Sequence, residues 1–301
     1  MPFWLARRRF VALTAGFVSV GAGAASAQSV TAGQPNEAAF RATLAALEAK
    51  NGGRLGVMAL HIGSKERLSY KADERFAMCS THKFITAAAI LKQVDEGHLK
   101  LDQLVDYSQA DILSYAPITS QHVKAGAMTV AALCQAALEW SDNTAANLLL
   151  GLIGGPAGWT RFARSIGDKT SRLDRTEPTL NTATPGDVRD TTTPAAMAED
   201  LDVVLLGHVL SGSSRQLLRT WMLDNQITND LLRAGVPKGW RVADKSGSGD
   251  NGTRNDIGLI LPPPPSQPII ATVYYTSSPQ PASLRDAVIA QVGRLIAQSF
   301  A

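Results

Sequence analysis

Cysteine is scarce in this chain and long apolar runs are nearly absent, and each shortage excludes a class of protein. Two cysteines, Cys79 and Cys134, occur among 301 residues, too few for a small scaffold held together by disulfides. Beyond residue 27 there is no run of about 18 apolar residues, the length that a membrane-spanning helix needs. We therefore expect a soluble protein in which both thiols are free.

Basic clusters, aromatic ladders and metal-ligand spacings are also missing. The formal net charge is +3, and the first 27 residues hold three arginines and no acid, so the remainder of the chain has a formal charge of 0. Without a basic cluster we expect no nucleic-acid partner. The five histidines are scattered and form no metal-ligand pattern with cysteines or carboxylates, so we expect no metal and no other cofactor.

The first 27 residues have the composition of an export signal. Arg7-Arg8-Arg9 precedes an apolar stretch that reaches about Ala24, and Ala25-Ser26-Ala27 is a small-residue cleavage pattern. The paired arginines, followed by Phe10-Val11, also fit a twin-arginine signal, which exports folded proteins. We predict that residues 28–301 form the mature protein, which is periplasmic or secreted and has no membrane anchor.

Strand-like segments lie at both ends of the mature chain, with helices between them. The predicted strands are 55–62, 67–70, 240–245, 256–261 and 269–275, and the predicted outer helices are 38–49 and 283–299. This order indicates an α/β fold (an α+β sandwich), in which an antiparallel sheet of about five strands is flanked by helices. We expect one discontinuous α/β lobe (about 28–75 and 235–301), an all-helical lobe (about 76–234) and an active site in the cleft between them.

A serine and a lysine lie one helical turn apart at the start of an apolar helix. Ser80-Thr81-His82-Lys83 is followed by the apolar run from Phe84 to Leu91. A serine becomes a good nucleophile when a neighbour takes its proton, and a lysine can do so where its surroundings favour the neutral amine. Ser-x-x-Lys also arises by chance about once in a chain of this length, so the motif alone is weak.

Three further clusters have equally simple structural alternatives. Ser141-Asp142-Asn143 stands at a predicted helix start, where a serine or aspartate is a common N-cap. Lys245-Ser246-Gly247-Ser248-Gly249 follows a predicted strand, where a turn is the ordinary interpretation. Glu177 and Asn181 lie in a long loop between 172 and 193, where a carboxylate is usually just solvated.

Taken together, these clusters resemble the ordered motifs of the class A serine β-lactamases. Their order and spacing are far more specific than any one cluster, and the resemblance covers essentially the whole mature chain. The four matching motifs are Ser80-x-x-Lys83, Ser141-Asp142-Asn143, Glu177-Pro-x-Leu-Asn181 and Lys245-Ser246-Gly247.

The resemblance implies a reaction in two stages. Ser80 attacks the lactam carbonyl of penicillins and cephalosporins and forms an acyl-enzyme, with the backbone amides of Ser80 and Ser248 binding the oxyanion. Lys83 or Glu177, acting through a water, takes the serine proton, and this alternative stays open. Ser141 relays a proton to the lactam nitrogen near Lys245, and Glu177 activates the water that cleaves the acyl-enzyme.

The same resemblance assigns substrate contacts and loop contacts. Asn143 contacts the substrate side-chain amide, Tyr115 stacks at the cleft entrance, and Asn181 helps to position the water. Lys245, Ser246 and Arg254 bind the substrate carboxylate, to which the donor fork of an arginine is suited. In the loop, Arg175 and Asp190 close the neck, and Pro178 follows a cis peptide bond.

Some positions differ from those of known subgroups of this family and bear on its substrate specificity. The position that would complete the carbapenemase-type disulfide with Cys79 holds Gly249, which argues against that subgroup. Some members of the family join a cysteine at the position of Cys134 in a disulfide, but the partner position here holds Ala87. Ser248-Gly249-Asp250 is similar to the extended-spectrum cephalosporinases, so activity on cefotaxime-type substrates is a hypothesis. The rival functions are a D,D-peptidase, which lacks the deacylating carboxylate, and a non-catalytic sensor of β-lactams. We expect a monomer.

Overall fold

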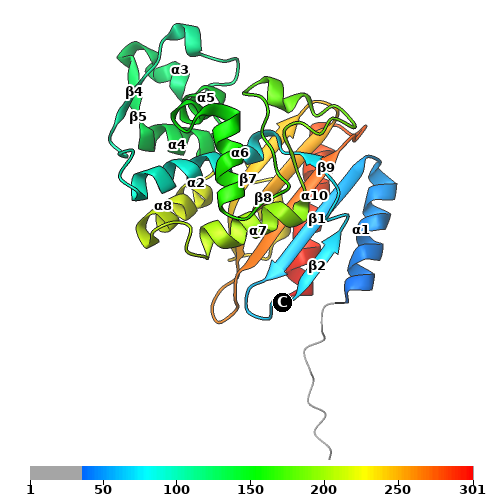
Figure 1. Ribbon diagram of the computed structural model, residues 1–301. Coiled ribbons are helices and arrows are strands. Elements are labelled where there is room, and N and C mark those ends of the chain that lie inside the picture. The colour runs from blue at the N-terminus through cyan, green and yellow to red at the C-terminus, as the bar shows by residue number, and fades with distance from the viewer. Residues whose placement is uncertain (1–35, 301) are drawn as a thin grey trace, which may run out of the picture. The chain divides into compact units, whose positions relative to one another are not determined.

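The computed structural model describes residues 36–300 of the chain. The predicted export signal, residues 1–27, lies outside the described residues, so the structure does not test it. Figure 1 shows a sheet on one side of the molecule and a group of helices on the other. No helix among residues 36–300 combines the length and the apolar character that crossing a membrane requires.

Five antiparallel strands form the main sheet, in the order β2-β1-β9-β8-β7, which confirms the predicted fold class. Strands from the two ends of the chain are neighbours, because β1 pairs with β9 along its whole length. Both are continuous apolar runs, which is the pattern of a strand covered on both faces. Their bounds are β1 (Arg54–His61), β2 (Arg67–Tyr70), β7 (Arg241–Gly249), β8 (Thr253–Leu261) and β9 (Ile269–Thr276).

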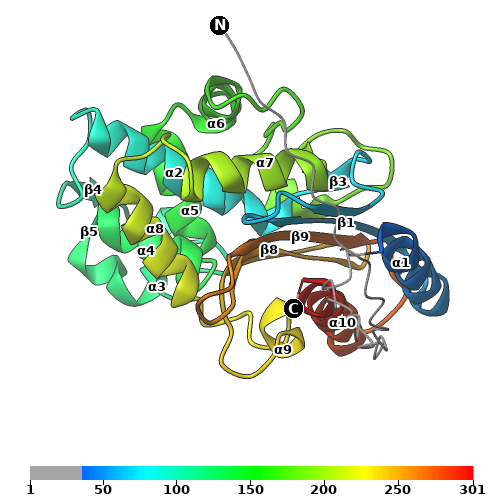
Figure 2. The same ribbon diagram turned by 90° about the horizontal axis from the view of Figure 1, so that it is seen from below.

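Two helices from the ends of the chain cover one face of the sheet. They are α1 (Glu37–Asn51) and α10 (Ala282–Ser299), and Figure 2 shows both below the sheet. Their inward residues include Leu44 of α1 and Val292 of α10, which pack in one apolar cluster with residues of β1, β8 and β9. Amphipathic helices bury one stripe in this way.

The other face of the sheet supports the helical part of the molecule, in which α7 lies against β1 and β9. Helix α2 lies inside this part and is buried on nearly every side, from His82 to Leu91. A helix that is apolar all round is expected in such a place. The helices of this part are α2 (His82–Asp95), α3 (Thr119–His122), α4 (Val130–Glu139), α5 (Asn143–Leu152), α6 (Gly155–Ser165), α7 (Pro194–Leu205) and α8 (Gly212–Leu223). The short helix α9 (Leu232–Gly235) instead packs against α10, on the face that α1 and α10 cover.

One boundary in the sheet corrects the sequence interpretation. Strand β7 does not end at Lys245 but continues to Gly249, so the Lys-Ser-Gly cluster lies in a strand and the turn follows it. The register pairs Gly249 with Thr253 of β8, although this stretch has no apolar pattern. Backbone ladder bonds do not depend on side chains, and a Cβ on Gly247 would lie 2.7 Å from the carbonyl oxygen of Met78. Glycine therefore lets this strand approach the segment before Ser80.

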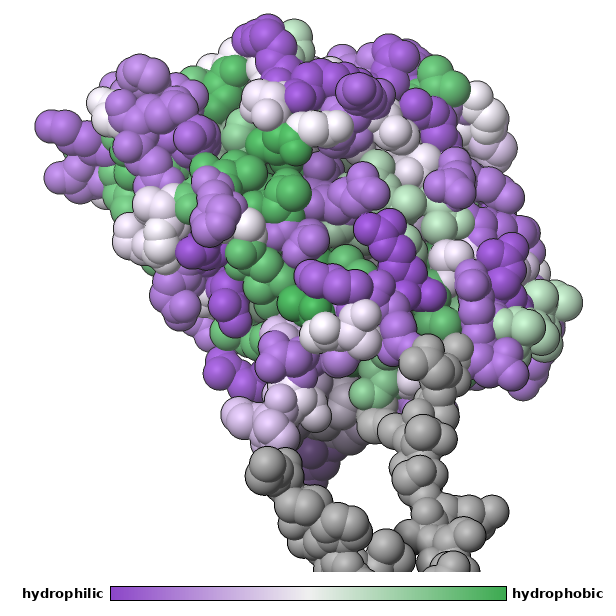
Figure 3. Space-filling model, turned by 60° about the horizontal axis from the view of Figure 1, so that its bottom comes forward, coloured by the Kyte–Doolittle hydropathy of each residue, from purple (hydrophilic) through white to green (hydrophobic). Residues whose placement is uncertain are grey.

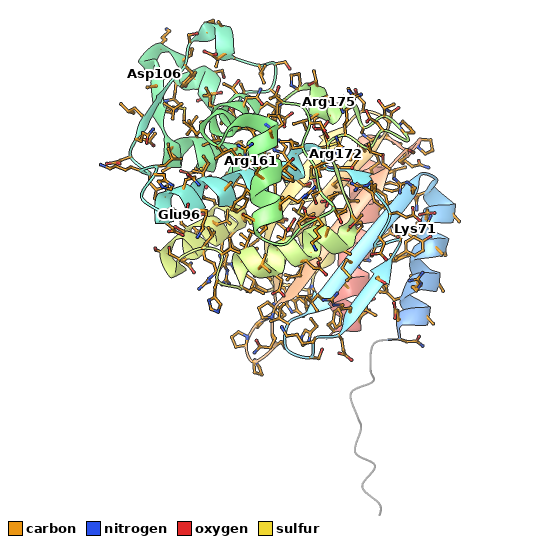
Figure 4. All side chains as sticks on the ribbon, viewed as in Figure 1. Lys71, Glu96, Asp106, Arg161, Arg172 and Arg175 are labelled. Carbon is orange, nitrogen blue, oxygen red and sulfur yellow. The ribbon has the colours of Figure 1, made fainter. Side chains whose placement is uncertain are left out.

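The long loop between 172 and 193 is held closed at its base. Nε of Arg175 donates to Oδ2 of Asp190 at 2.6 Å, and Figure 4 labels Arg175 on this loop. Oδ1 of Asp190 also accepts from the backbone amides of Asp174 and Arg175. The peptide bond between Glu177 and Pro178 is cis, as the resemblance implied. The loop is thus a fixed part of the molecule that carries Glu177.

Two threonines cap helices of the helical part, and the prediction of free thiols is confirmed. Thr129 and Thr193 cap α4 and α7, since their hydroxyls accept from the backbone amides of Ala132 and Ala196. Within residues 36–300, Cys79 and Cys134 are both free, and both are buried.

Candidate active site

The candidate nucleophile stands on a short 3₁₀ turn, Cys79–Thr81, that leads into α2. Cys79 has a φ of 47°, a left-handed conformation that is rare for a residue with a side chain. Two hydrogen bonds fix the turn, because the carbonyl of Met78 accepts from the hydroxyl of Thr81 at 2.8 Å and from Nδ2 of Asn255 at 3.1 Å. Such strain is kept only where the surroundings hold it, and here they hold the serine at the start of the helix.

The ammonium of Lys83 lies at the centre of the site and is fully buried. Its Nζ donates to Oγ of Ser80 at 3.0 Å, to the carbonyl of Ser141 at 2.8 Å and to Oδ1 of Asn143 at 2.6 Å. Burial lowers the pKa of Lys83, although the carboxylate of Glu177 opposes this effect. The neutral amine is therefore more accessible here than on a protein surface.

The carboxylate of Glu177 reaches the same serine from the long loop. Oγ of Ser80 donates to Oε1 of Glu177 at 3.2 Å, and Asn181 donates to Oε2. Asn147 of α5 pairs with the backbone of Glu177 in both directions, at 2.8 and 3.0 Å. Burial by itself would raise the pKa of Glu177, but the charge of Lys83 and a hydrogen bond from His82 outweigh it and hold that pKa well below its usual range.

Ser141 connects the two buried lysines. Its Oγ accepts from Nζ of Lys83 at 3.3 Å and from Nζ of Lys245 at 3.1 Å. Burial lowers the pKa of Lys245 well below its ordinary value, and the nearby charge of Lys83 adds to the effect. The N-cap alternative applies to the neighbouring residue, because it is Asp142 whose side chain accepts from the first turn of α5. Ser141 itself is left free to face the serine and the lysines.

A cavity of about 330 Å³ opens beside these groups. Arg254 of β8 lies at its edge, where it donates to Oγ of Ser248 and to Oδ1 of Asp286, each at 2.6 Å. Tyr115 is 46% exposed at the opening. The cavity is lined by Ser80, Tyr115, Ser141, Asn143, Asn181, Ile227, Ser246, Ser248 and Arg254. Hydroxyls, amides and a guanidinium thus surround a space suited to a small polar anion.

All the site residues predicted from the sequence lie in or beside this cavity. They come from the turn before α2, from α2, from the start of α5 and the segment before it, from the long loop, from β7 and β8, and from the segment before α3. Sequence reasoning missed three residues that hold them in place: His82, Asn147 and Asp286. His82 carried a signal, because it lies inside the Ser-x-x-Lys motif. Nothing in the local sequence pointed to Asn147 or Asp286, whose contacts are made across the fold.

Comparison with known proteins identifies the family. A model of the Beta-lactamase enzyme family matches residues 39–300. The β-lactamase CTX-M-97 of Escherichia coli is 48% identical over 257 residues, which are 85% of this chain and 88% of that protein. An ancestral (GNCA) class A β-lactamase superposes with a TM-score of 0.85 at 54% identity, covering 87% of this chain and 100% of that one. The chain belongs to the class A serine β-lactamases.

A further relative extends the match over nearly the full length. The β-lactamase L2 of Stenotrophomonas maltophilia is 46% identical over 297 residues, which are 97% of this chain and 98% of that protein. This class A β-lactamase is therefore a hydrolase of β-lactams that works through a serine acyl-enzyme, an activity that confers antibiotic resistance. Membership of this class excludes the two rivals, a D,D-peptidase and a non-catalytic sensor.

Proposed function

We propose that Ser80 is the nucleophile of this β-lactamase and that Glu177 ends each cycle by activating the hydrolytic water. The observation that carries the proposal is the position of Ser80 Oγ, which lies 3.0 Å from Nζ of Lys83 and 3.2 Å from Oε1 of Glu177. A nucleophile and its bases must be within hydrogen-bond reach, and both bases are. The backbone amides of Ser80 and Ser248 are the proposed oxyanion donors.

Two routes for removing the serine proton agree with this geometry. Lys83 serves as the base if the burial that lowers its pKa leaves the amine neutral when substrate is bound. Glu177 serves if a water passes the proton to its carboxylate. In either route Ser141 delivers a proton to the lactam nitrogen, which its contacts with Lys83 and Lys245 support. Lys245 contributes positive charge near that transfer.

For deacylation, Asn181 supports Glu177 as the partner of the water. The amide of Asn181 donates to Oε2 of Glu177, while its own Oδ1 is buried and has no hydrogen-bond partner among residues 36–300. A buried acceptor without a partner is costly unless it bonds to water. An acceptor and a carboxylate side by side would hold a water for attack on the acyl carbonyl.

The substrate carboxylate is assigned to Ser246 and Arg254, which line the cavity, and to the buried Lys245, which donates to Oγ of Ser141 and to the carbonyl of Ser246. The guanidinium of Arg254 keeps a planar fork of donors, and Asp286 fixes its orientation. Asn143 and Tyr115 are assigned to the substrate side chain. We propose penicillins and cephalosporins as substrates, with the cefotaxime type as the open question raised by Ser248-Gly249-Asp250.

Turnover kinetics with the purified mature chain test this assignment. Benzylpenicillin and nitrocefin should be hydrolysed over many cycles, and a Ser80→Ala variant should show neither hydrolysis nor a covalent adduct by mass spectrometry. Stoichiometric acylation without turnover, or an adduct on the Ser80→Ala variant, would refute it. Slow or absent hydrolysis of cefotaxime beside rapid turnover of penicillin would exclude the extended-spectrum hypothesis alone.

We also propose that the protein is exported after removal of residues 1–27, that residues 28–301 form one discontinuous β-lactamase domain, and that it acts as a monomer. The face in Figure 3 supports the monomer, because its apolar residues stand in small groups among polar ones. N-terminal sequencing of the protein recovered from the periplasm tests the cleavage site. Light scattering at assay concentration tests the monomer.

A further inference from the structure

His82 is a buried titratable side chain within the site that the reaction described above does not use. It follows Ser80 by two residues, at the first position of α2, and its exposed fraction is 0%. Its Nε2 lies 3.4 Å from Oε1 of Glu177, and its Nδ1 lies 3.2 Å from the hydroxyl of Thr86, one turn along the helix. The imidazole is therefore placed between a helix hydroxyl and the carboxylate.

The tautomer of His82 follows from its neighbours. If Nδ1 carried the proton, the lone pair of Nε2 would face the ionised carboxylate of Glu177, which is repulsive. If Nε2 carries it, the ring donates to Oε1, and Nδ1 must accept a hydrogen bond from another group. The hydroxyl of Thr86 lies 3.2 Å from Nδ1 and 3.1 Å from the carbonyl of His82, and its one proton can go to either. That carbonyl also accepts from Nε1 of Trp159 at 3.0 Å, so it keeps a donor when Thr86 donates to Nδ1.

The charges around His82 favour a neutral ring. The groups that face it are Glu177 of the long loop, Lys83 of α2 and Lys245 of β7. Burial lowers the pKa of His82 and both lysines lower it further, while only Glu177 opposes them. If His82 were charged, it and Lys83 would be two buried cations that share the single carboxylate of Glu177, which is unfavourable.

We propose that His82 is a positioning residue for Glu177, which as the neutral Nε2–H tautomer donates to Oε1 and keeps that oxygen ionised and directed at Ser80. The proposal rests on the function assigned above to Glu177. Oε1 then receives three donors, from Ser80, Lys83 and His82, and Oε2 receives Asn181. A donor to the ionised form favours it, so the loss of His82 should make Glu177 easier to protonate.

The first test compares two substitutions under conditions in which deacylation limits kcat. His82→Phe removes the donor, whereas His82→Gln places an amide nitrogen close to the position of Nε2 and keeps it. We expect the acid limb of the kcat–pH profile to move up by about one unit in His82→Phe, while kcat at pH 8 changes less than about threefold. His82→Gln should retain the wild-type limb. A limb that stays in place in His82→Phe, or moves equally in both variants, would overturn the proposal.

The second test measures the wild-type protein and needs a variant only to assign one signal. Nitrogen-15 NMR of the histidine-labelled wild-type protein reports which ring nitrogen carries the proton, and His82 is assigned by the signal that disappears in His82→Gln. We expect a neutral ring protonated at Nε2. A ring protonated at Nδ1, or a charged ring at neutral pH, would overturn the proposal.

A third experiment distinguishes failure of the proposal for His82 from failure of the function assigned to Glu177. Glu177→Ala should accumulate acyl-enzyme if Glu177 is the deacylating base. If it does so and His82→Phe leaves the acid limb in place, the proposal for His82 fails alone. If Glu177→Ala turns over normally, the function assigned to Glu177 fails, and the role proposed for His82 fails with it.

Discussion

Nζ of Lys83 lies 3.0 Å from Oε1 of Glu177, and both side chains are completely buried. The two candidate bases of the acylation step therefore form an ion pair, and the protonation state of each depends on the other. Removing one partner of a buried pair leaves the other charge uncompensated, which typically costs several kcal/mol. Substitution of either residue consequently perturbs both, and the two steps of the reaction must be measured separately.

Glu177→Ala should block deacylation more than acylation. Lys83 still reaches Ser80 in this variant, whereas the carboxylate that would activate the water is gone. We expect the acyl-enzyme to accumulate in mass spectra after mixing with penicillin, with deacylation slowed by at least about a hundredfold. The matched control is Asn147→Ala, which disturbs only the backbone contacts of Glu177 and should keep measurable turnover. Equal losses in both steps would instead make Glu177 mainly an acylation base.

Arg254→Ala should weaken the binding of substrates that carry the carboxylate. The guanidinium lies at the edge of the cavity beside Ser248, and a charge-assisted hydrogen bond of this kind is worth about ten- to a hundredfold in affinity. We expect KM to rise by that factor while kcat falls less. Asp286→Asn, which loosens the guanidinium but keeps its charge, should give a smaller rise in KM. A loss in kcat with unchanged KM would show that Arg254 does not bind the carboxylate.

Asp200→Asn should stabilise the protein at neutral pH. Asp200 of α7 is 1% exposed, and its Oδ2 has no hydrogen-bond partner among residues 36–300. Burial raises its pKa well above the ordinary value, and the nearby carboxylate of Asp168 adds to this. The folded state thus binds a proton more tightly than the unfolded state, so stability falls as the pH rises from about 4 towards the folded pKa.

The asparagine variant should lack this decline. We expect its free energy of unfolding to exceed that of the wild type by about 1 to 3 kcal/mol at pH 7 and to match it near pH 4. Urea unfolding at the two pH values measures the difference. A variant that is less stable than the wild type at pH 7 would show that Asp200 is ionised and paired in the folded protein.

Both thiols should be inert in the native protein. Cys79 and Cys134 are buried and free, and burial raises the pKa of each thiol far above its usual range. A thiol reagent such as DTNB should label neither cysteine in the folded enzyme and both after denaturation. Rapid labelling of Cys79 in the native protein would mean that the turn before Ser80 opens in solution, and rapid labelling of Cys134 would mean that α4 becomes exposed.

The fold class and most element positions follow from the sequence because they depend on local pattern. The continuous apolar runs of β1 and β9 were each visible in a few consecutive residues. The strand through Lys245 to Gly249 was not, since its ladder consists of backbone bonds to β8 and its serines and glycines have no apolar period. Gly247 and Gly249 let this strand approach Met78 and Cys79 closely, and they do not form a turn.

The chemistry of the site also depends partly on the local sequence and partly on the tertiary structure. The sequence by itself determined which groups are present, because four motifs in a fixed order supply the hydroxyl, the amines, the carboxylate and the amides. Only the tertiary structure decided what surrounds them: that Lys83 and Glu177 are buried as one pair, that Asp286 fixes Arg254, and that His82 faces Glu177. The reason is physical, since a pKa and a hydrogen bond depend on burial and on distances of a few ångströms between residues far apart in the chain.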